Sequence, residues 1–180
     1  MFRAMPNFYV WRPADSCETA AAWYFAETST EKPSALVLSR QKMPQLENSS
    51  KEALKGAYIL CDSTKEVPDG IIMATGSEVS LAVEAREILL KEGMDVRVVS
   101  MPCIDLFEDQ STEYKETVLP SSVTKRVSVE ALSTFGWGKY TGLNGKNIGM
   151  TTFGASSPAE NLFPHFGITT EAVVEAMKSL

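Results

Sequence analysis

The sequence reads Ile71-Ile72-Met73-Ala74-Thr75-Gly76-Ser77-Glu78-Val79 near its centre, an apolar run followed by a glycine turn. Short apolar runs of this kind are typical of strands that are buried on both faces of a sheet. Gly76 can adopt a positive φ without steric cost, which suits a tight turn after the strand. The stretch therefore predicts a strand that turns directly into a helix.

The residues after this turn predict an amphipathic helix and then a second strand. Apolar side chains at helical spacing form one face of the helix: Leu81, Ala82, Ala85, Ile88 and Leu89. Gly93 suits the position just after the helix, where a left-handed conformation is common. Residues 95–101 then predict a strand. Such a βαβ unit nearly always makes a right-handed crossover in a parallel sheet.

The same alternation of strands and helices extends to both sides of this unit. Further strands are predicted at residues 8–11, 34–39, 56–62, 125–130 and 147–151. Further helices are predicted at residues 16–27, at 109–118, after an N-cap at Ser157, and after an N-cap at Thr169 or Thr170. The fold class is therefore α/β, in three α/β/α layers around a mostly parallel sheet of about five strands.

A loss of periodicity divides the chain into two parts. Residues 42–54 predict a linker with about one helical turn, and residues 55–180 hold the five strands of the main sheet. Residues 1–41 predict a βαβ remnant. Its helix begins with a capping box of Asp15 and Glu18. This remnant is too small to stand alone, so we expect the sheet to which it belongs to lie upstream.

Composition argues against several classes of function. The formal net charge of −6 and the pI of about 4.9 disfavour binding to nucleic acid or to anionic membranes, which needs a basic face. No apolar run approaches the length of a membrane span, and the first residues do not form a signal peptide. Three distant cysteines predict reduced thiols in a cytoplasmic protein, and a single histidine argues against a zinc site.

Four segments, taken in order, resemble transketolase. They are residues 7–15 ending in WRPAD, residues 34–41 ending in LSRQ, residues 74–79 reading ATGSEV, and residues 137–140 reading WGKY together with 152–156, which contain FGAS. The resemblance covers essentially the whole chain. It favours the carboxyl-terminal third of transketolase over the related deoxyxylulose-phosphate synthases and pyruvate dehydrogenase β chains.

The resemblance implies a domain division and a role. Residues 1–41 would be the tail of the pyrimidine-binding domain, residues 42–54 a linker, and residues 55–180 the C-terminal domain. The whole enzyme would use thiamine diphosphate and a divalent metal (magnesium or calcium) to transfer a two-carbon ketol unit from a ketose phosphate to an aldose phosphate in the pentose phosphate pathway. Its partners would be the upstream domains, sugar phosphates and a second copy in a homodimer. The family's metal motif, activating glutamate and active-site histidines would lie upstream, so this chain would bind no cofactor or metal and be inactive alone.

Arg40 is the leading candidate site residue. The resemblance implies that it contacts the phosphate of the sugar phosphate. An arginine fork also matches phosphate oxygens, and the carboxyl end of a strand faces the ligand crevice in such sheets. The alternative is a surface arginine paired with a carboxylate. Ser39 could add a hydroxyl, although a strand-end cap is the simpler interpretation.

Other residues carry weaker functional hypotheses. Thr75, Gly76 and Ser77 form a glycine turn at a helix start and could hold an anion, but a structural role is favoured because the glycines of GxGxxG and the P-loop lysine are missing. Glu130 and Asp105 could do acid–base work only if they met, and His165 is interpreted as a loop residue. Phe135, Trp137 and Tyr140 could form a partner surface or pack locally.

Two other classes of function remain open beside the enzyme. Residues 55–180 could form an independent small-ligand-binding or regulatory module that uses the strand ends near Thr75–Ser77 and Glu130. The chain could also be a purely structural assembly domain. No nucleophile, catalytic triad or dinucleotide fingerprint favours a hydrolase or a dehydrogenase.

Overall fold

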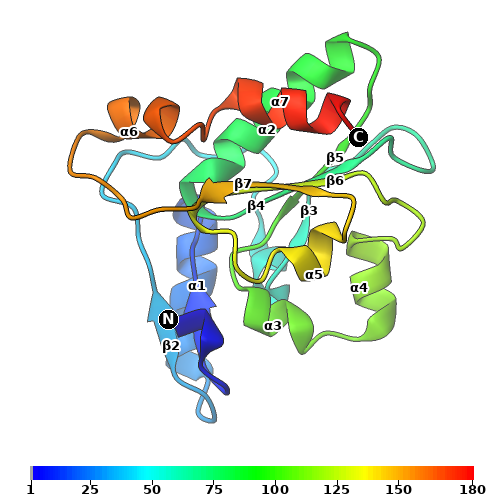
Figure 1. Ribbon diagram of the computed structural model, residues 1–180. Helices are drawn as coiled ribbons and strands as arrows, with labels where there is room; N and C mark the ends of the chain where they lie inside the picture. Colours follow the sequence, from blue (N-terminus) through cyan, green and yellow to red (C-terminus); the bar gives the residue numbers. More distant parts are fainter. Residues whose placement is uncertain (1) are drawn as a thin grey trace.

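The computed structural model describes residues 2–180, which form a small N-terminal part and a larger α/β domain (Figure 1). The N-terminal part contains η1 (Phe2–Ala4), β1 (Tyr9–Trp11), α1 (Ser16–Thr28) and β2 (Ser34–Leu36). β1 and β2 pair in parallel, with Trp11 opposite Leu36. β2 is shorter than the predicted strand 34–39 because β1, its pairing partner, ends at Trp11.

The larger domain is built on one five-stranded sheet. Its strands are β3 (Tyr58–Cys61), β4 (Ile71–Ala74), β5 (Arg97–Ser100), β6 (Arg126–Ser133) and β7 (Lys146–Met150). Their order is β3-β5-β4-β6-β7, and only β3 runs antiparallel to its neighbour. The predicted α/β class and mostly parallel sheet are confirmed.

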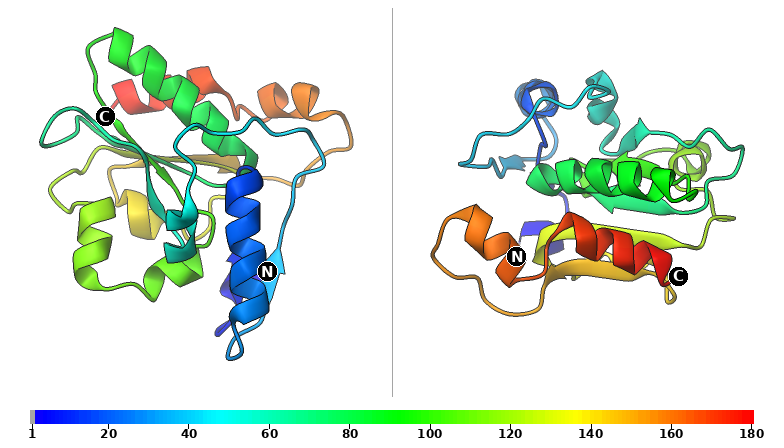
Figure 2. Two further views of the ribbon diagram at one scale, coloured as in Figure 1. Left: turned by 180° about the vertical axis from the view of Figure 1, so that it is seen from behind. Right: turned by 90° about the horizontal axis from the view of Figure 1, so that it is seen from above.

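Helices cover both faces of this sheet, as Figures 1 and 2 show. α2 (Val79–Lys91) and α7 (Thr170–Lys178) lie on one face, while α3 (Ile104–Glu108), α4 (Thr112–Val118) and α5 (Gly138–Thr141) lie on the other. The sheet residues alternate between the two cores. Ile72 and Ala74 pack with α2 and α7, whereas Ile71 and Met73 pack against Phe107. β4 is therefore buried on both faces, as its apolar sequence predicts.

The predicted glycine turn at Thr75–Ser77 forms. After β4, Gly76 adopts a φ of +63° and starts η3 (Gly76–Glu78), which continues into α2. Ala82, Ala85 and Leu89 of the predicted apolar face are buried. Gly93 follows the C-cap Glu92 with a φ of +89°. α2 joins β4 to β5, its parallel neighbour, so the predicted βαβ unit is confirmed.

Two helix predictions are corrected by the structure. The predicted helix 109–118 is α4, which begins only at Thr112 because Ser111 caps it, and α3 at residues 104–108 was not predicted. α6 (Ala159–His165) begins after Pro158, not after Ser157. The ψ of 146° at Pro158 is extended, so Pro158 itself is the N-cap and Ser157 lies outside the helix.

The remaining segments complete the chain. The predicted linker contains one helical turn, η2 (Lys51–Lys55). Thr169 caps α7 by accepting a hydrogen bond from the Ala172 N–H, as predicted. No helix within residues 2–180 has the length and apolar character that crossing a bilayer requires.

Candidate functional site

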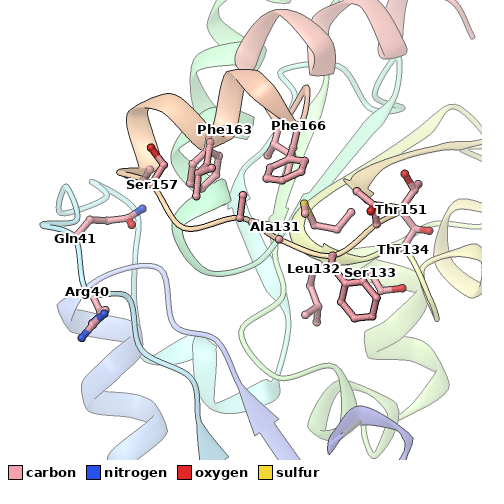
Figure 3. Close-up of a pocket in the computed structure, with 18 residues that line it drawn as sticks. Arg40, Gln41, Ala131, Leu132, Ser133, Thr134, Thr151, Ser157, Phe163 and Phe166 are labelled. Atoms are coloured by element: carbon pink, nitrogen blue, oxygen red, sulfur yellow. The ribbon is translucent and has the colours of Figure 1, made fainter.

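Arg40 lies in the irregular stretch after β2, at the rim of an open cleft (Figure 3). Its guanidinium points away from Phe163 and Phe166 on the opposite side. Arg40 is exposed, and within residues 2–180 it takes part in no salt bridge. Ser39 is exposed beside it. The guanidinium is therefore open to an anion from outside the chain.

The cleft has a volume of about 1140 Å³ and lies where β6 and β7 end. Its apolar wall comes from the strand ends and α6: Leu132, Met150, Phe153, Leu162, Phe163 and Phe166. Hydroxyl groups of Ser133, Thr134 and Thr151 also line it. Of the described residues that line the cleft, only Arg40 carries a charge. Ligands of α/β sheets bind outside the carboxyl ends of parallel strands, and this cleft occupies that place.

The turn at Thr75–Ser77 has little capacity left for an anion. The Gly76 N–H donates to the Arg12 carbonyl at 2.9 Å, and the Thr75 hydroxyl donates to the same oxygen at 3.2 Å. The Ser77 hydroxyl donates to the Glu78 carboxylate. These donors are occupied and a buried carboxylate lies beside them, so the geometry favours the structural interpretation.

A buried ion network joins the N-terminal part to the end of β6. Arg12 Nη1 lies 2.7 Å from Glu130 and 3.0 Å from Glu78, and Arg3 lies 2.6 Å from Glu130. Trp137 Nε1 also donates to Glu130 at 2.8 Å. Burial alone would raise the pKa of Glu130, but Arg3 and Arg12 outweigh it and hold that pKa below its ordinary value. Glu130 is thus a fixed negative charge in the contact between the two parts.

Glu130 and Asp105 do not form an acid–base pair. Asp105 lies in α3, where its carboxylate accepts from the Val10 N–H at 3.4 Å. Burial raises the pKa of Asp105. Both carboxylates serve the contact with the N-terminal part. This network was not predicted from the sequence, although an arginine in the WRPAD segment and a carboxylate on a buried strand were its visible signals.

Glu18 forms a second buried contact between the two parts. Its carboxylate accepts from the Ala14 N–H at 2.7 Å, from the Tyr58 hydroxyl at 2.9 Å and from the Ser100 hydroxyl at 2.5 Å. Burial raises its pKa, because no cation is among these donors. The predicted capping box is therefore half correct. Asp15 caps α1, but the Glu18 side chain bonds to Ala14 and the larger domain instead of returning to the Asp15 N–H.

Of the three aromatic residues that were predicted to form a partner surface or to pack locally, two pack locally. Trp137 and Tyr140 are buried and pack with Phe107 against the sheet. Phe135 is 76% exposed. His165 was predicted as a loop residue, but it is the last residue of α6, where it is exposed and lies edge-on to Phe166.

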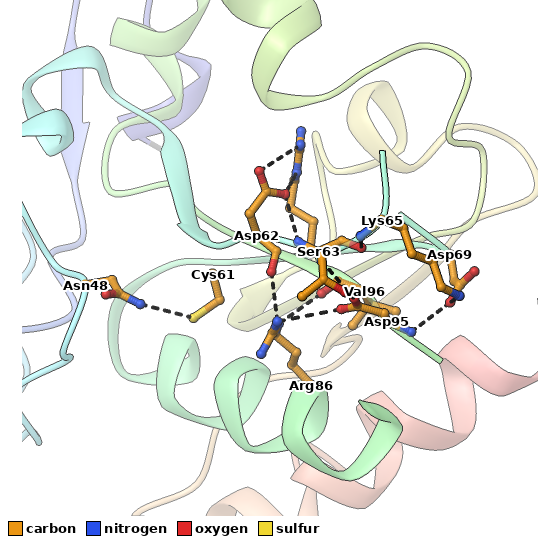
Figure 4. Close-up of polar contacts among 11 residues, drawn as sticks. Asn48, Cys61, Asp62, Ser63, Lys65, Asp69, Arg86, Asp95 and Val96 are labelled. Carbon is orange, nitrogen blue, oxygen red and sulfur yellow. Dashed lines mark hydrogen bonds and ion pairs between the residues drawn. The ribbon is translucent and has the colours of Figure 1, made fainter. Parts of the chain in front are cut away.

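A further group of carboxylates lies at the opposite end of the sheet (Figure 4). Asp95 accepts from the Thr64 N–H and hydroxyl at 2.8 and 2.6 Å, and Asp69 accepts from the Asp95 N–H at 2.7 Å. Arg86 donates to the carbonyls of Asp62 and Val96. These contacts hold the loop between β3 and β4. Among residues 2–180, no group of three or more His, Cys, Asp or Glu is placed to hold a metal ion.

Comparisons with known proteins agree over the full length of the chain. Residues 56–169 match the family described as transketolase-like C-terminal domain, and residues 1–45 match the transketolase pyrimidine-binding domain. Transketolase-1, chloroplastic, of Arabidopsis thaliana is 56% identical over 180 residues, which are 99% of this chain and 24% of the relative. Transketolase of Bacillus subtilis (strain 168) is 52% identical over 182 residues, which are 99% of this chain and 27% of the relative.

Solved structures give the same result. Transketolase from Leishmania mexicana superposes with a TM-score of 0.91 at 48% identity, covering 99% of this chain and 26% of that one. The chain thus spans about a quarter of the length of the relatives it matches. Because one family description covers well over half of the residues and the identity extends across all of them, the chain belongs to the transketolase family.

Proposed function

We propose that this chain is the C-terminal part of a transketolase, which transfers a two-carbon ketol unit from a ketose phosphate to an aldose phosphate. The observation that carries the proposal is the identity of 52–56% to two transketolases across 99% of the chain. Related solved structures include Pichia stipitis transketolase in complex with fructose-6-phosphate, sedoheptulose-7-phosphate and xylulose-5-phosphate. Sugar phosphates are therefore the substrate class that we propose for the enzyme.

We propose the domain division that the sequence predicted. Residues 1–41 are the tail of the pyrimidine-binding domain, residues 42–54 are the linker, and residues 55–180 are the C-terminal domain. The two family matches, 1–45 and 56–169, support this division. The two-stranded sheet supports it as well, because so small a parallel sheet needs further strands to be stable.

Arg40 is proposed to bind the phosphate of the sugar substrate, with Ser39 as a weaker contributor. Two facts support this role. Arg40 is exposed at the rim of a cleft at strand ends, and the described chain offers it no carboxylate partner. The two-pronged donor geometry of a guanidinium suits a phosphate. The alternative, a surface arginine paired with a carboxylate, has no such pair to support it within residues 2–180.

The residues of this chain do not fit thiamine diphosphate or its divalent metal. The buried carboxylates within residues 2–180 are bound to arginines, hydroxyls, a side-chain amide and backbone N–H groups, and no described group of three or more His, Cys, Asp or Glu could hold a metal ion. We therefore propose that other parts of the enzyme hold the cofactor and metal, and that this chain alone is inactive. Its contribution is Arg40, structural support and part of a homodimer contact. Exposed Phe135 and Phe153 offer apolar side chains that such a contact would bury.

A reducing compartment, the cytoplasm, is proposed for the enzyme. Cys17, Cys61 and Cys103 are free thiols. Burial raises the pKa of Cys103 to about 12, so this thiol stays protonated at neutral pH. Free thiols without disulfides are typical of proteins kept in a reducing environment.

A chimera tests the proposal directly. The matching C-terminal residues of the Bacillus subtilis enzyme, 182 in the alignment, are replaced by this chain. We expect the chimera to transfer ketol units from a ketose phosphate to an aldose phosphate, and the 180-residue chain alone to show no activity. A folded, dimeric chimera without activity would contradict the assignment. Activity of the chain alone would contradict the placement of the cofactor residues.

Arg40→Ala in this chimera tests the phosphate contact. Charge-assisted hydrogen bonds contribute about 1.5–3 kcal/mol, so we expect the KM for the ketose phosphate to rise about tenfold to about a hundredfold. The KM for the same ketose without its phosphate should stay unchanged. Lys42→Ala removes an exposed cation two residues away and serves as the matched control. An equal effect of both variants would indicate a general electrostatic attraction instead of a contact.

The cleft favours a second candidate function, an independent module that binds a small ligand without catalysis. It would use the apolar wall of α6 and the hydroxyls at the ends of β6 and β7. A thermal-shift screen of the chain with inorganic phosphate, sugar phosphates and nucleotides separates the candidates. Stabilisation by a nucleotide, combined with an inactive chimera, would favour the module. If no probe raises the melting temperature of the chain, the module hypothesis loses its support.

A further inference from the structure

The loop that carries Arg40 is held at both ends by one short segment of the N-terminal part. Before Arg40, the Val37 N–H donates to the carbonyl of Trp11 at 2.8 Å. After Arg40, the Leu46 N–H donates to the Asp15 carboxylate at 3.1 Å. Trp11 and Asp15 are the first and last residues of the WRPAD segment. This segment therefore fixes where the loop leaves β2 and where it rejoins the body of the protein.

Asp15 is the stronger of these two anchors. Its side chain is only 5% exposed and accepts four hydrogen bonds. Oδ1 accepts from the Glu18 N–H at 3.0 Å, which caps α1, and from the Ser49 hydroxyl at 2.9 Å. Oδ2 accepts from Gln45 Nε2 at 2.6 Å and from the Leu46 N–H. One carboxylate thus joins the start of a helix to three residues of the linker.

The loop between the anchors has no regular structure of its own. Residues 37–44 belong to no helix or strand. Arg40 takes part in no salt bridge within residues 2–180. The position of its guanidinium therefore depends on where the two ends of the loop are held. Because a displacement of about 1 Å at a binding group can cost up to about a hundredfold in rate, these ends matter for a phosphate contact.

We propose that Asp15 is a positioning residue for Arg40, and that it acts by pinning the linker at Gln45, Leu46 and Ser49. Asp15 does not touch the substrate. The proposal rests on the phosphate role of Arg40 for its effect on the reaction, but its structural half, the immobilisation of the Arg40 loop, does not.

Asp15→Asn is the sharpest variant for this test. Asparagine keeps the size of the side chain and is itself a good N-cap, so one oxygen can still accept from the Glu18 N–H. The NH₂ group then replaces Oδ2 and faces two donors, Gln45 Nε2 and the Leu46 N–H. Gln45→Ala is the second variant, because it leaves Asp15 and the cap intact. Ser111→Ala is the matched control, since it removes the cap of α4, whose described hydrogen bonds involve no residue of 37–49.

The first measurement is the ¹⁵N order parameter of the Arg40 backbone in the 180-residue chain. We expect about 0.8 in the parent chain and below about 0.6 in Asp15→Asn and Gln45→Ala, the value typical of flexible backbone. Ser111→Ala should leave it unchanged. A mobile Arg40 in the parent chain, or an unchanged order parameter in both linker variants, would overturn the inference.

The second measurement is the KM of the chimera for a ketose phosphate and for the same ketose without phosphate. Asp15→Asn should raise only the first KM, by about fivefold. In the Arg40→Ala background the same substitution should have no further effect, because the two residues act through one contact. Additive effects, or equal increases for both donors, would show that Asp15 supports the fold in general.

The two arms also separate this inference from the proposed function. If Arg40→Ala leaves both KM values unchanged, the phosphate role fails, whatever the order parameters show. If Arg40→Ala raises the KM for the ketose phosphate while Asp15→Asn changes neither the KM nor the order parameter, the function stands and the positioning role of Asp15 is refuted.

Discussion

At the scale of single residues, two buried carboxylates each join the N-terminal part to the larger domain, one through charged partners and the other through neutral partners. Glu130 is paired with the guanidinium groups of Arg3 and Arg12, and Glu18 accepts only from uncharged donors. Burial disfavours the charged form of both groups. Cations reverse this effect for Glu130 alone, so its pKa is lowered while that of Glu18 is raised. The two contacts should therefore respond to pH in opposite directions.

Glu130 should support the fold above its unfolded pKa of about 4.3 and lose that effect as the pH falls through its lower folded pKa. In the acid range the unfolded state takes up the proton first, so stability falls. We expect Glu130→Gln to flatten the acid limb of the unfolding free energy, measured by urea titration between pH 5 and pH 3 (roughly the range set by these pKa values). The same variant should cost about 3 kcal/mol at pH 7, because it breaks a buried pair. An unchanged acid limb would contradict the ion pairing.

Glu18 should act in the range above about pH 4.3, where the folded state takes up the proton first. Its contribution to stability therefore increases as the pH falls through its raised folded pKa. Glu18→Gln removes the stability that the parent gains when Glu18 takes up a proton. As the pH falls from neutral to about 4.3, the unfolding free energy of the variant should therefore decline more steeply than that of the parent. The comparison uses slopes, which do not depend on any constant loss from the substitution. Parallel profiles would contradict the raised pKa.

At the scale of helices and strands, local patterns predicted the central elements well. The apolar run at Ile71, the glycine turn and the apolar face of α2 all depend on neighbours in the sequence, so β4, the turn and α2 were predictable. α3 was missed, and α4 was predicted to begin at Asp109 instead of Thr112, because Ser111, a good N-cap, was passed over. The antiparallel placement of β3 beside β5 was not predicted, since pairing between distant strands leaves no local signal.

In the candidate site too, a single residue could be chosen from the sequence, but its long-range contacts could not. Arg40 was chosen as a candidate from its place at the end of a predicted strand and from the resemblance, but β2 ends at Leu36 and Arg40 lies in the loop after it. The contacts of Asp15 with the linker and of Arg12 with Glu130 were not predicted, because they join residues 30 to 34 and 118 positions apart. The residue types were visible in the sequence, but which donor meets which acceptor is decided only when the two parts of the chain pack together.

Gly56 illustrates how one residue limits the approach of two elements. It has a φ of +84° at the end of η2, and its carbonyl accepts from the Cys103 N–H at the start of α3 at 2.9 Å. A Cβ at this position would lie 2.5 Å from the Cys103 carbonyl and would also clash with the Phe107 nitrogen. Both neighbours are backbone atoms, so they cannot move aside as a flexible side chain could.

We expect Gly56→Ala to lower the free energy of unfolding by at least about 3 kcal/mol, as other severe steric changes do. Gly93→Ala is the control, because Gly93 has a similar φ of +89° but no atom within 4 Å of its Cβ position. The control should lose only the conformational term of about 1–2 kcal/mol. Chemical denaturation of both variants measures the difference. Equal losses would show that the close approach of α3 contributes nothing.

At the scale of the whole molecule, the N-terminal part and the α/β domain are joined by buried polar contacts. Glu18 bonds to Tyr58 and Ser100, and Arg12 bonds to Glu78 and Glu130. Breaking such a contact leaves a buried charge without a partner, which is far more costly than losing an exposed ion pair. The two parts should therefore open together, although they match two different domain families.

Hydrogen exchange in low concentrations of urea tests this coupling. In the parent chain, the amides of α1 and α2 should report the same free energy of opening, because one cooperative unit exposes both. Arg12→Met leaves Glu78 and Glu130 without this cation and should destabilise the contact by about 3–5 kcal/mol, so α1 should then open well before α2. Lys32→Met is the matched control, since Lys32 also joins the two parts, but through a more exposed pair with Asp109. It should leave the two helices opening together. If α1 opens before α2 in the parent chain, the buried network does not bind the two parts into one folding unit. If α1 opens before α2 in the Arg12 variant alone, that network is the connection.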